Sequence, residues 1–220
     1  MMKSLILATL LILPGATYAQ GFTDGLELSF YTGYQDAPHS RVSGFDPGGL
    51  EDYSFLVDWE GKSFSPPPYY GLRAMWWKDA GWGWGVEFNH AKVYASDETK
   101  ADNSVDHLEF TDGLNIFTAN FGKRWPEKFG RFTPYVIGGL GFAMPHVEMT
   151  TAGGTTFGYQ VTGPAMEAVA GMSYAFNDRW SAFGEYKFTY SQNKADLDNG
   201  GTLNTDVITN AFNVGVSFNF

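Results

Sequence analysis

The sequence has no cysteine, and beyond residue 19 it has no apolar run long enough to form a transmembrane helix. Disulfides are therefore excluded, and a closed fold must be held by backbone pairing. Basic residues are also scarce, because 14 Lys and Arg stand against 24 Asp and Glu and the formal net charge is -10. A chain this acidic lacks the positive surface that nucleic acid requires, so nucleic acid is not expected among its partners.

The N-terminal segment has the features of a secretory signal peptide. Lys3 precedes an apolar stretch over residues 5–13, and small residues follow up to Ala19. A positive start, a short apolar stretch and small residues before a cleavage site are typical of exported chains. We predict Sec-type export and cleavage after Ala19, which makes 1–19 the signal peptide and 20–220 a single mature domain.

The C-terminal segment alternates strictly between apolar and small polar residues. In a membrane barrel, the apolar face of such a strand contacts lipid and the polar face lines the interior. The last strand of outer-membrane barrels usually ends in Phe, and this segment resembles it. The apolar face consists of Phe212, Val214, Val216, Phe218 and Phe220.

Similar alternation recurs along the chain and predicts an all-β fold. Aromatic residues make up 17% of the sequence and glycine reaches 27 residues, as expected for aromatic girdles and crowded interiors. At ~10 residues per strand, the length predicts a transmembrane antiparallel β-barrel of about eight strands, with short periplasmic turns and long extracellular loops. The expected strands cover residues 25–35, 69–77, 82–93, 114–125, 135–144, 161–176 and 180–191 and the C-terminal segment. The expected long loops cover 36–68, 96–113, 145–160 and 192–209.

Seven charged residues fall on the inward faces of these strands. Narrow barrels are filled by side chains, and buried charges must pair because an uncompensated buried ion costs several kcal/mol. We therefore expect a plug of salt bridges in the interior, with catalysis there as the alternative. The residues are Glu27, Arg73, Glu87, Arg124, Glu167, Glu185 and Lys187.

Three of the four histidines follow a strand that runs toward the extracellular side. His39, His90 and His146 would therefore share one rim of a closed barrel. Histidine ligates metals well, and a nearby carboxylate would complete a centre of the kind that non-haem iron uses. Candidate carboxylates are Asp36, Glu60 and Glu148, although no HxxxH or HExxH spacing occurs. Without such a site, each of these histidines would be an ordinary polar loop residue.

Several segments at these rim positions are similar to the lipid A oxidase family of Gram-negative outer-membrane proteins. They are GYQDAPHSRVSG, WEGKSF with PPPYYG after it, FNHAKVYA, LEFTDGLN, TPYVIGGLGFAMPHVE and FGEYKFTYSQN. The resemblance extends from about Leu26 to Phe220, and TPYVIGGLGF and the terminal Phe would match many small opacity-type barrels. It implies oxidation of the proximal glucosamine of lipid A, lacking its 1-phosphate, to 2-aminogluconate, with oxygen as acceptor and hydrogen peroxide as product.

This activity would require a redox group, because electron transfer to oxygen usually depends on a flavin or a metal. The cofactor is unknown, and a divalent or redox metal is the hypothesis, held by His39, His90, His146 and Glu148. In this scheme the catalytic residues are Asp36, His39, Glu60, His90 and His146, with Asp36 or Glu60 as the base. The residues that would bind lipid A phosphate are Arg41, Lys62 and Lys92.

Two other functions remain open at this point. Long acidic loops would equally suit a non-enzymatic barrel with a structural or surface-interaction role. A lipid A acyl hydrolase would need a serine beside a histidine, for which Ser40 and Ser191 are candidates, but the sequence has no GxSxG elbow. In each case the expected partners are lipopolysaccharide and outer-membrane lipid, and the expected state is a monomer.

Overall fold

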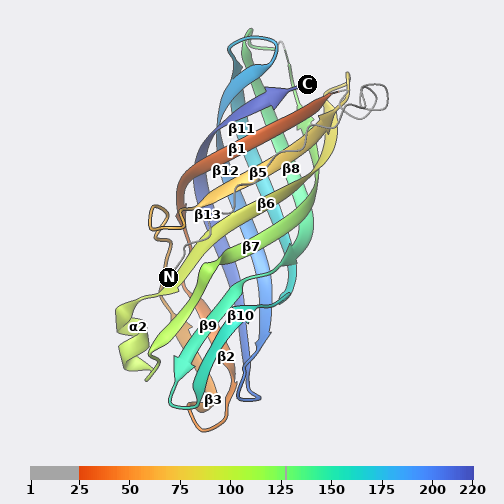
Figure 1. Cartoon of the computed structure of the whole chain (residues 1–220). Helices are drawn as coiled ribbons and strands as arrows, with labels where there is room; N and C mark the ends of the chain where they lie inside the picture. The colour runs from red at the N-terminus through yellow and green to blue at the C-terminus, as the bar shows by residue number, and fades with distance from the viewer. Residues whose placement is uncertain (1–24, 127) are drawn as a thin grey trace, which may run out of the picture.

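The structure is a computed structural model that describes residues 25–126 and 128–220, so the predicted signal peptide 1–19 lies outside the described residues. Eight antiparallel strands close into a barrel, with each strand paired to the next and the last paired to the first (Figure 1). The predicted barrel is therefore confirmed. The strands are β1 (Leu26–Asp36), β5 (Tyr70–Trp77), β6 (Trp82–Ala95), β7 (His107–Arg124), β8 (Phe132–Ala143), β11 (Gly163–Ala175), β12 (Trp180–Asp196) and β13 (Thr202–Asn219).

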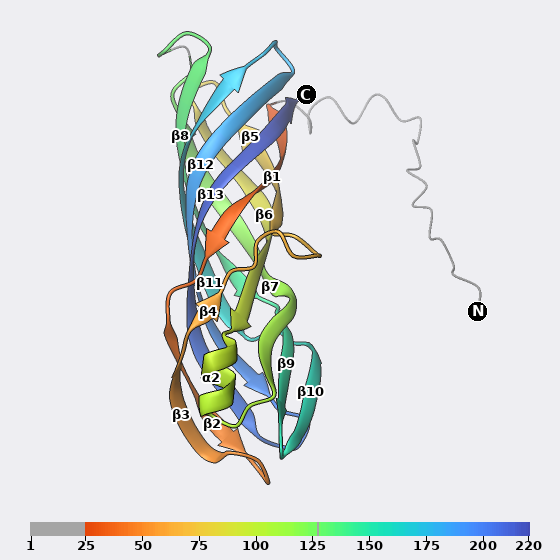
Figure 2. The same cartoon turned by 90° about the vertical axis from the view of Figure 1, so that its left-hand side faces the viewer.

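The sheet continues beyond the barrel into the long connections, below the barrel in Figures 1 and 2. There β2 pairs with β13 and β3, β4 pairs with β6, and β9 pairs with β7 and β10. Residues 107–113 and 145–160, predicted as loop, are thus largely strand, because each supplies the other with a hydrogen-bonding partner. These elements are β2 (Ser40–Asp46), β3 (Glu51–Val57), β4 (Trp59–Glu60), α2 (Asp97–Asp102), β9 (His146–Thr151) and β10 (Gly154–Tyr159).

The outward face of the barrel is apolar, as contact with lipid requires. Cross-strand pairing aligns these side chains in rows, and one row contains stacked or tilted aromatic rings: Phe88 and Phe117 have centroids 5.0 Å apart, and Phe117 and Phe142 5.3 Å. Near the short turns a second aromatic row includes Trp76 and Trp84, with centroids 4.7 Å apart. Among the described residues, no helix is long and apolar enough to cross a membrane.

The interior of the membrane-spanning half contains the predicted ion pairs. Arg73 donates to Glu87 at 2.5 Å and to both carboxylate oxygens of Glu185 at 2.8 and 2.9 Å, and Lys187 donates to Glu87 at 2.6 Å and to Glu167. All five side chains are buried. The network joins β5 and β6 to β11 and β12 across the barrel, so the predicted plug is confirmed for five of its seven residues. The other two, Glu27 and Arg124, form a separate ion pair at 3.5 Å. Further hydrogen bonds to the network come from Tyr31, Asn120, Tyr135 and Asn213.

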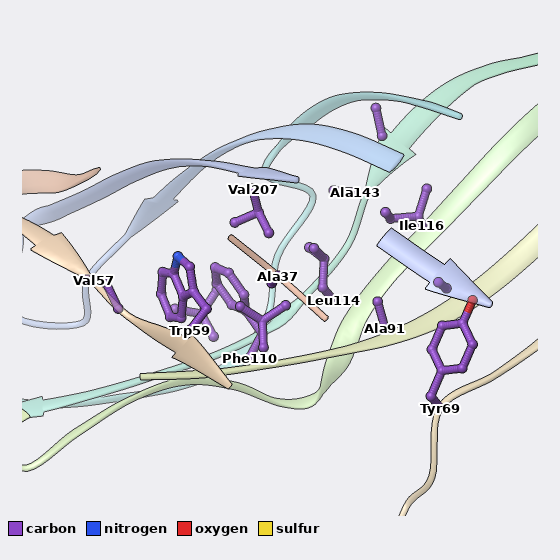
Figure 3. Close-up of a cluster of buried hydrophobic side chains, with 14 of the residues drawn as sticks. Ala37, Val57, Trp59, Tyr69, Ala91, Phe110, Leu114, Ile116, Ala143 and Val207 are labelled. Atoms are coloured by element: carbon purple, nitrogen blue, oxygen red, sulfur yellow. The ribbon is translucent and has the colours of Figure 1, made fainter. Parts of the chain in front are cut away.

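The extracellular half of the interior is apolar instead. Figure 3 shows Trp59 of β4 beside Phe110 of β7, and their rings stack with centroids 6.2 Å apart. Val57, Leu114 and Val207 are buried in the same cluster, each with no exposed surface. Trp59 also donates from Nε1 to Ser40 Oγ at 2.8 Å. The barrel interior is therefore filled at two levels, by ions in the membrane-spanning half and by apolar side chains in the extracellular half.

The extracellular loop tips converge on one buried carboxylate. Asp46, at the end of β2, accepts hydrogen bonds from Thr151 Oγ1 at 2.6 Å, Asn199 Nδ2 at 2.6 Å and the backbone N–H of Leu50 at 3.0 Å. Burial alone would raise the pKa of Asp46, but these hydrogen bonds outweigh it and the pKa is lowered. One ionised residue thus connects the tips of three loops.

Candidate functional site at the outward extracellular rim

The five site residues predicted in and just before the first long connection are exposed, and four of them contact a nearby side chain. His39 Nε2 lies 2.5 Å from Asp58 Oδ1, and both side chains are more than half exposed. Glu60 and Lys62 form a salt bridge of 2.9 Å. Arg41 donates to Ser54 Oγ at 3.2 Å, and Asp36, the last residue of β1, is exposed.

Two further candidates differ from what the sequence suggested. Lys92 was predicted to meet lipid A phosphate, but it is fully buried and its ammonium donates to the carbonyl of Pro67 at 2.8 Å. Lys92 therefore holds the 61–69 connection against β6.

Glu148, which was a candidate metal ligand, lies on β9 opposite Glu109 of β7 and is partly exposed.

The predicted joint metal site is not assembled. Within residues 25–126 and 128–220, no group of three or more His, Cys, Asp or Glu side chains could hold a metal ion. His39 pairs with Asp58, whereas His90 and His146 lie among aromatic rings elsewhere. The four residues proposed as ligands thus do not fit a common ion.

His90 instead lies at the centre of a polar patch on the outward face. It pairs across the sheet with Tyr70 on one side and Asn115 on the other, so all three project outward in one row. The Tyr70 ring stacks on the imidazole with centroids 5.1 Å apart, and His90 Nδ1 lies 2.9 Å from Asn115 Oδ1. His90 is only 4% exposed, and its Nε2 has no hydrogen-bond partner among the described residues.

A local irregularity in β7 closes the patch over His90. The pairing of β6 with β7 shifts between Ala91 and Val93, where β7 contains extra residues. Gly113 has a φ of 89°, and a Cβ added there would lie 2.4 Å from the imidazole. Glycine is therefore required at this position, both for the backbone conformation and for the close approach to His90.

His146 and Tyr159 form the other side of this patch. They pair across β9 and β10, with ring centroids 4.7 Å apart, and the Tyr159 hydroxyl donates to Asp112 Oδ2 at 3.5 Å. Burial and the Asp112 carboxylate raise the pKa of Tyr159, so this phenol stays protonated at neutral pH. His146 is also 4% exposed, and its Nδ1 has no partner among the described residues. We call Tyr70, His90, Asp112, Asn115, His146 and Tyr159 the rim patch.

The rim patch lies next to the aromatic row of the barrel, on its extracellular side. On β6, His90 is the next outward residue after Phe88, and on β7, Asn115 is the next after Phe117. Aromatic rows mark the lipid–water interface of such barrels, so the patch lies at the level of lipid head groups. The exposed carboxylate of Asp112 and the phenol of Tyr159 can bind a polar, hydroxyl-bearing ligand, with the two buried histidines packed behind them.

Sequence reasoning identified His90 and His146 but missed four of the six residues. Tyr70 and Asn115 could have been found from register, because they lie opposite His90 on the neighbouring strands. Asp112 could not, since its position depends on the irregularity in β7, and Tyr159 could not, since its segment was predicted as loop.

A closed barrel with a lipid-facing apolar surface and an ion-paired interior in its membrane-spanning half is typical of the outer-membrane β-barrels. Neither a protein-family model nor a curated protein matches the sequence. The chain is similar in structure to Neisserial surface protein A, with a TM-score of 0.51 and 12% identity over 89% of this chain and 97% of that one. OprG from Pseudomonas aeruginosa has a TM-score of 0.49 and 14% identity over 90% and 98% of the two chains. At such identities the likeness concerns the fold alone, which is that of small outer-membrane β-barrels.

Proposed function

We propose that this chain is an outer-membrane enzyme that oxidises the proximal glucosamine of lipid A to 2-aminogluconate, with oxygen as acceptor and hydrogen peroxide as product. It would reach the outer membrane after Sec-type export and removal of residues 1–19. The observation that carries the proposal is the rim patch, which presents His90 and its neighbours outward at head-group level. The similarity of the rim segments to lipid A oxidases supports the choice of reaction.

The proposed chemistry starts at the free anomeric hydroxyl of the glucosamine. A base removes the hydroxyl proton, the C1 hydrogen leaves with its electron pair, and oxygen accepts both to become hydrogen peroxide. The sugar becomes a lactone, which water opens to the acid. Asp112 is the exposed carboxylate of the patch and the candidate base, and Tyr159, whose hydroxyl donates to it, is the neighbouring group that can contact a sugar hydroxyl.

None of the residues of the rim patch is proposed to hold the redox group. Hydride transfer to oxygen ordinarily depends on a flavin or a metal, and the described residues bring no cluster of three ligating side chains together. The rim patch is therefore assigned to holding the sugar and moving its proton.

The test is mass spectrometry of lipid A from cells whose lipid A lacks the 1-phosphate. We expect a gain of one oxygen atom, about 16 Da, in cells that express the chain and not in cells without it. His90→Ala should remove most of this gain, because it deletes the centre of the patch. His107→Ala is the matched control, since His107 is an exposed histidine at the start of β7 and lies outside the patch. Equal oxidation by the His90→Ala variant would refute the assigned site.

A non-enzymatic surface role is the second candidate. The observation that favours it is the projecting sheet of β2, β3, β9 and β10, whose loop tips Asp46 holds together. Unchanged lipid A in the same experiment would support this role. The acyl hydrolase has less support, because Ser40 Oγ contacts Thr205 and Trp59, and Ser191 Oγ accepts from Asn193. Loss of an acyl chain would nevertheless reveal it.

A further inference from the structure

A groove runs over the lipid-facing surface of β1, β5, β6 and β7. Its volume is about 440 Å³ and its lining is almost entirely apolar. Ala74 pairs with Leu28 on one side and Val86 on the other, and its side chain is the smallest of the three. The groove is thus a depression in an otherwise bulky surface, and Leu72, Phe88 and Phe117 also line it.

The groove and the rim patch are parts of one surface. Along β5 the outward residues after Ala74, toward the extracellular side, are Leu72 and then Tyr70, and Tyr70 pairs with His90. Four residues of strand at ~3.3 Å each place Tyr70 about 13 Å from Ala74 along the strand. An amphiphile with its head group at His90 would therefore have its chain at the level of Ala74.

We infer that one acyl chain of a lipid A molecule lies in this groove while its glucosamine head group contacts the rim patch. The inference rests on the proposed function, which supplies lipid A as the substrate. Lipid tails are as apolar as the groove, so the groove selects its occupant by shape and packing. The exposed carboxylate of Asp112, which accepts from Tyr159, favours a head group that offers hydroxyls over the anionic phosphate of a phospholipid.

The groove can be filled without altering the patch. Ala74→Leu adds bulk at its centre, and leucine is an ordinary residue on a lipid-facing surface. The matched control is Gly138→Leu, in a second outward groove of about 540 Å³ on β7, β8 and β11. A Cβ at Gly138 would meet only Glu167 O, at 4.0 Å, so the control substitution fits. Heat-dependent gel mobility shows whether each variant folds.

The experiment is native mass spectrometry of the purified full chain, mixed in detergent with 1-dephosphorylated lipid A and with phosphatidylethanolamine. We expect the wild type and Gly138→Leu to retain one lipid A, and folded Ala74→Leu to retain about tenfold less, equivalent to ~1.4 kcal/mol. Equal retention by Ala74→Leu, or preferential retention of the phospholipid by the wild type, would overturn the inference. Retention of lipid A without any oxidation would preserve the groove assignment and remove the oxidase, so the two proposals fail separately.

Discussion

Replacing Arg73 by methionine should destabilise the barrel strongly, because it removes the cation between two buried glutamates. Arg73 makes three charge-assisted hydrogen bonds, one to Glu87 and two to Glu185. After the substitution Glu87 keeps Lys187 at 2.6 Å, but Glu185 keeps only neutral donors from Tyr135 and Asn213 among its hydrogen bonds. Loss of one partner from a buried ion pair costs about 3–5 kcal/mol, and we expect Arg73→Met to fall in that range.

The assay is equilibrium unfolding in urea of the barrel in lipid vesicles, followed by tryptophan fluorescence and gel mobility. The double variant Arg73→Met/Glu185→Gln should recover part of the loss, because it removes the uncompensated charge. Lys100→Met is the control, since Lys100 pairs with an almost fully exposed Asp97 and such pairs contribute little. If Arg73→Met destabilises the barrel no more than Lys100→Met does, the interior network is not what holds the two faces of the barrel together.

Two further predictions concern the extracellular half. Trp59→Ala should lower the free energy of unfolding by about 3–5 kcal/mol and accelerate hydrogen exchange in β4 and β7, because it leaves a cavity beside Phe110. Unchanged hydrogen exchange in these strands would contradict the packing of the apolar cluster. The lowered pKa of Asp46 means that its contribution to stability is complete above the unfolded value of about 3.9 and is lost as the pH falls through the lower folded value. Protease cleavage at the loop tips should therefore rise below about pH 4 in the wild type. Asp46→Asn should be cleaved readily at neutral pH as well, and equal resistance of the two proteins at pH 7 would count against the role of Asp46.

The barrel itself could be predicted because lipid imposes strict alternation on every spanning strand. Glu87, for example, stands between Val86 and Phe88, so its inward direction follows once those two face lipid. The ion pairs then follow from the cost of burying an unpaired charge, although their partners depend on register.

The rim could be predicted only in part. The pattern of histidines that follow strands running toward the extracellular side predicts a shared rim. His39 and His90 do not meet there, because His39 lies before a separate hairpin of β2 and β3 and pairs with Asp58. The segment from His107 to Phe110 was predicted as loop, since its strand depends on a distant partner, β9. Strands outside the membrane do not face lipid, so their residues need not alternate between apolar and polar. Without that alternation such strands are not recognised from one sequence.

The most direct test of the proposed oxidation uses the purified chain in vesicles with 1-dephosphorylated lipid A and oxygen, with lipid mass and hydrogen peroxide measured together. We expect lipid A to gain about 16 Da and one peroxide to appear for each lipid converted, with both signals reduced together in His90→Ala. Lipid A of unchanged mass and no peroxide, from a barrel shown to be folded, would contradict it.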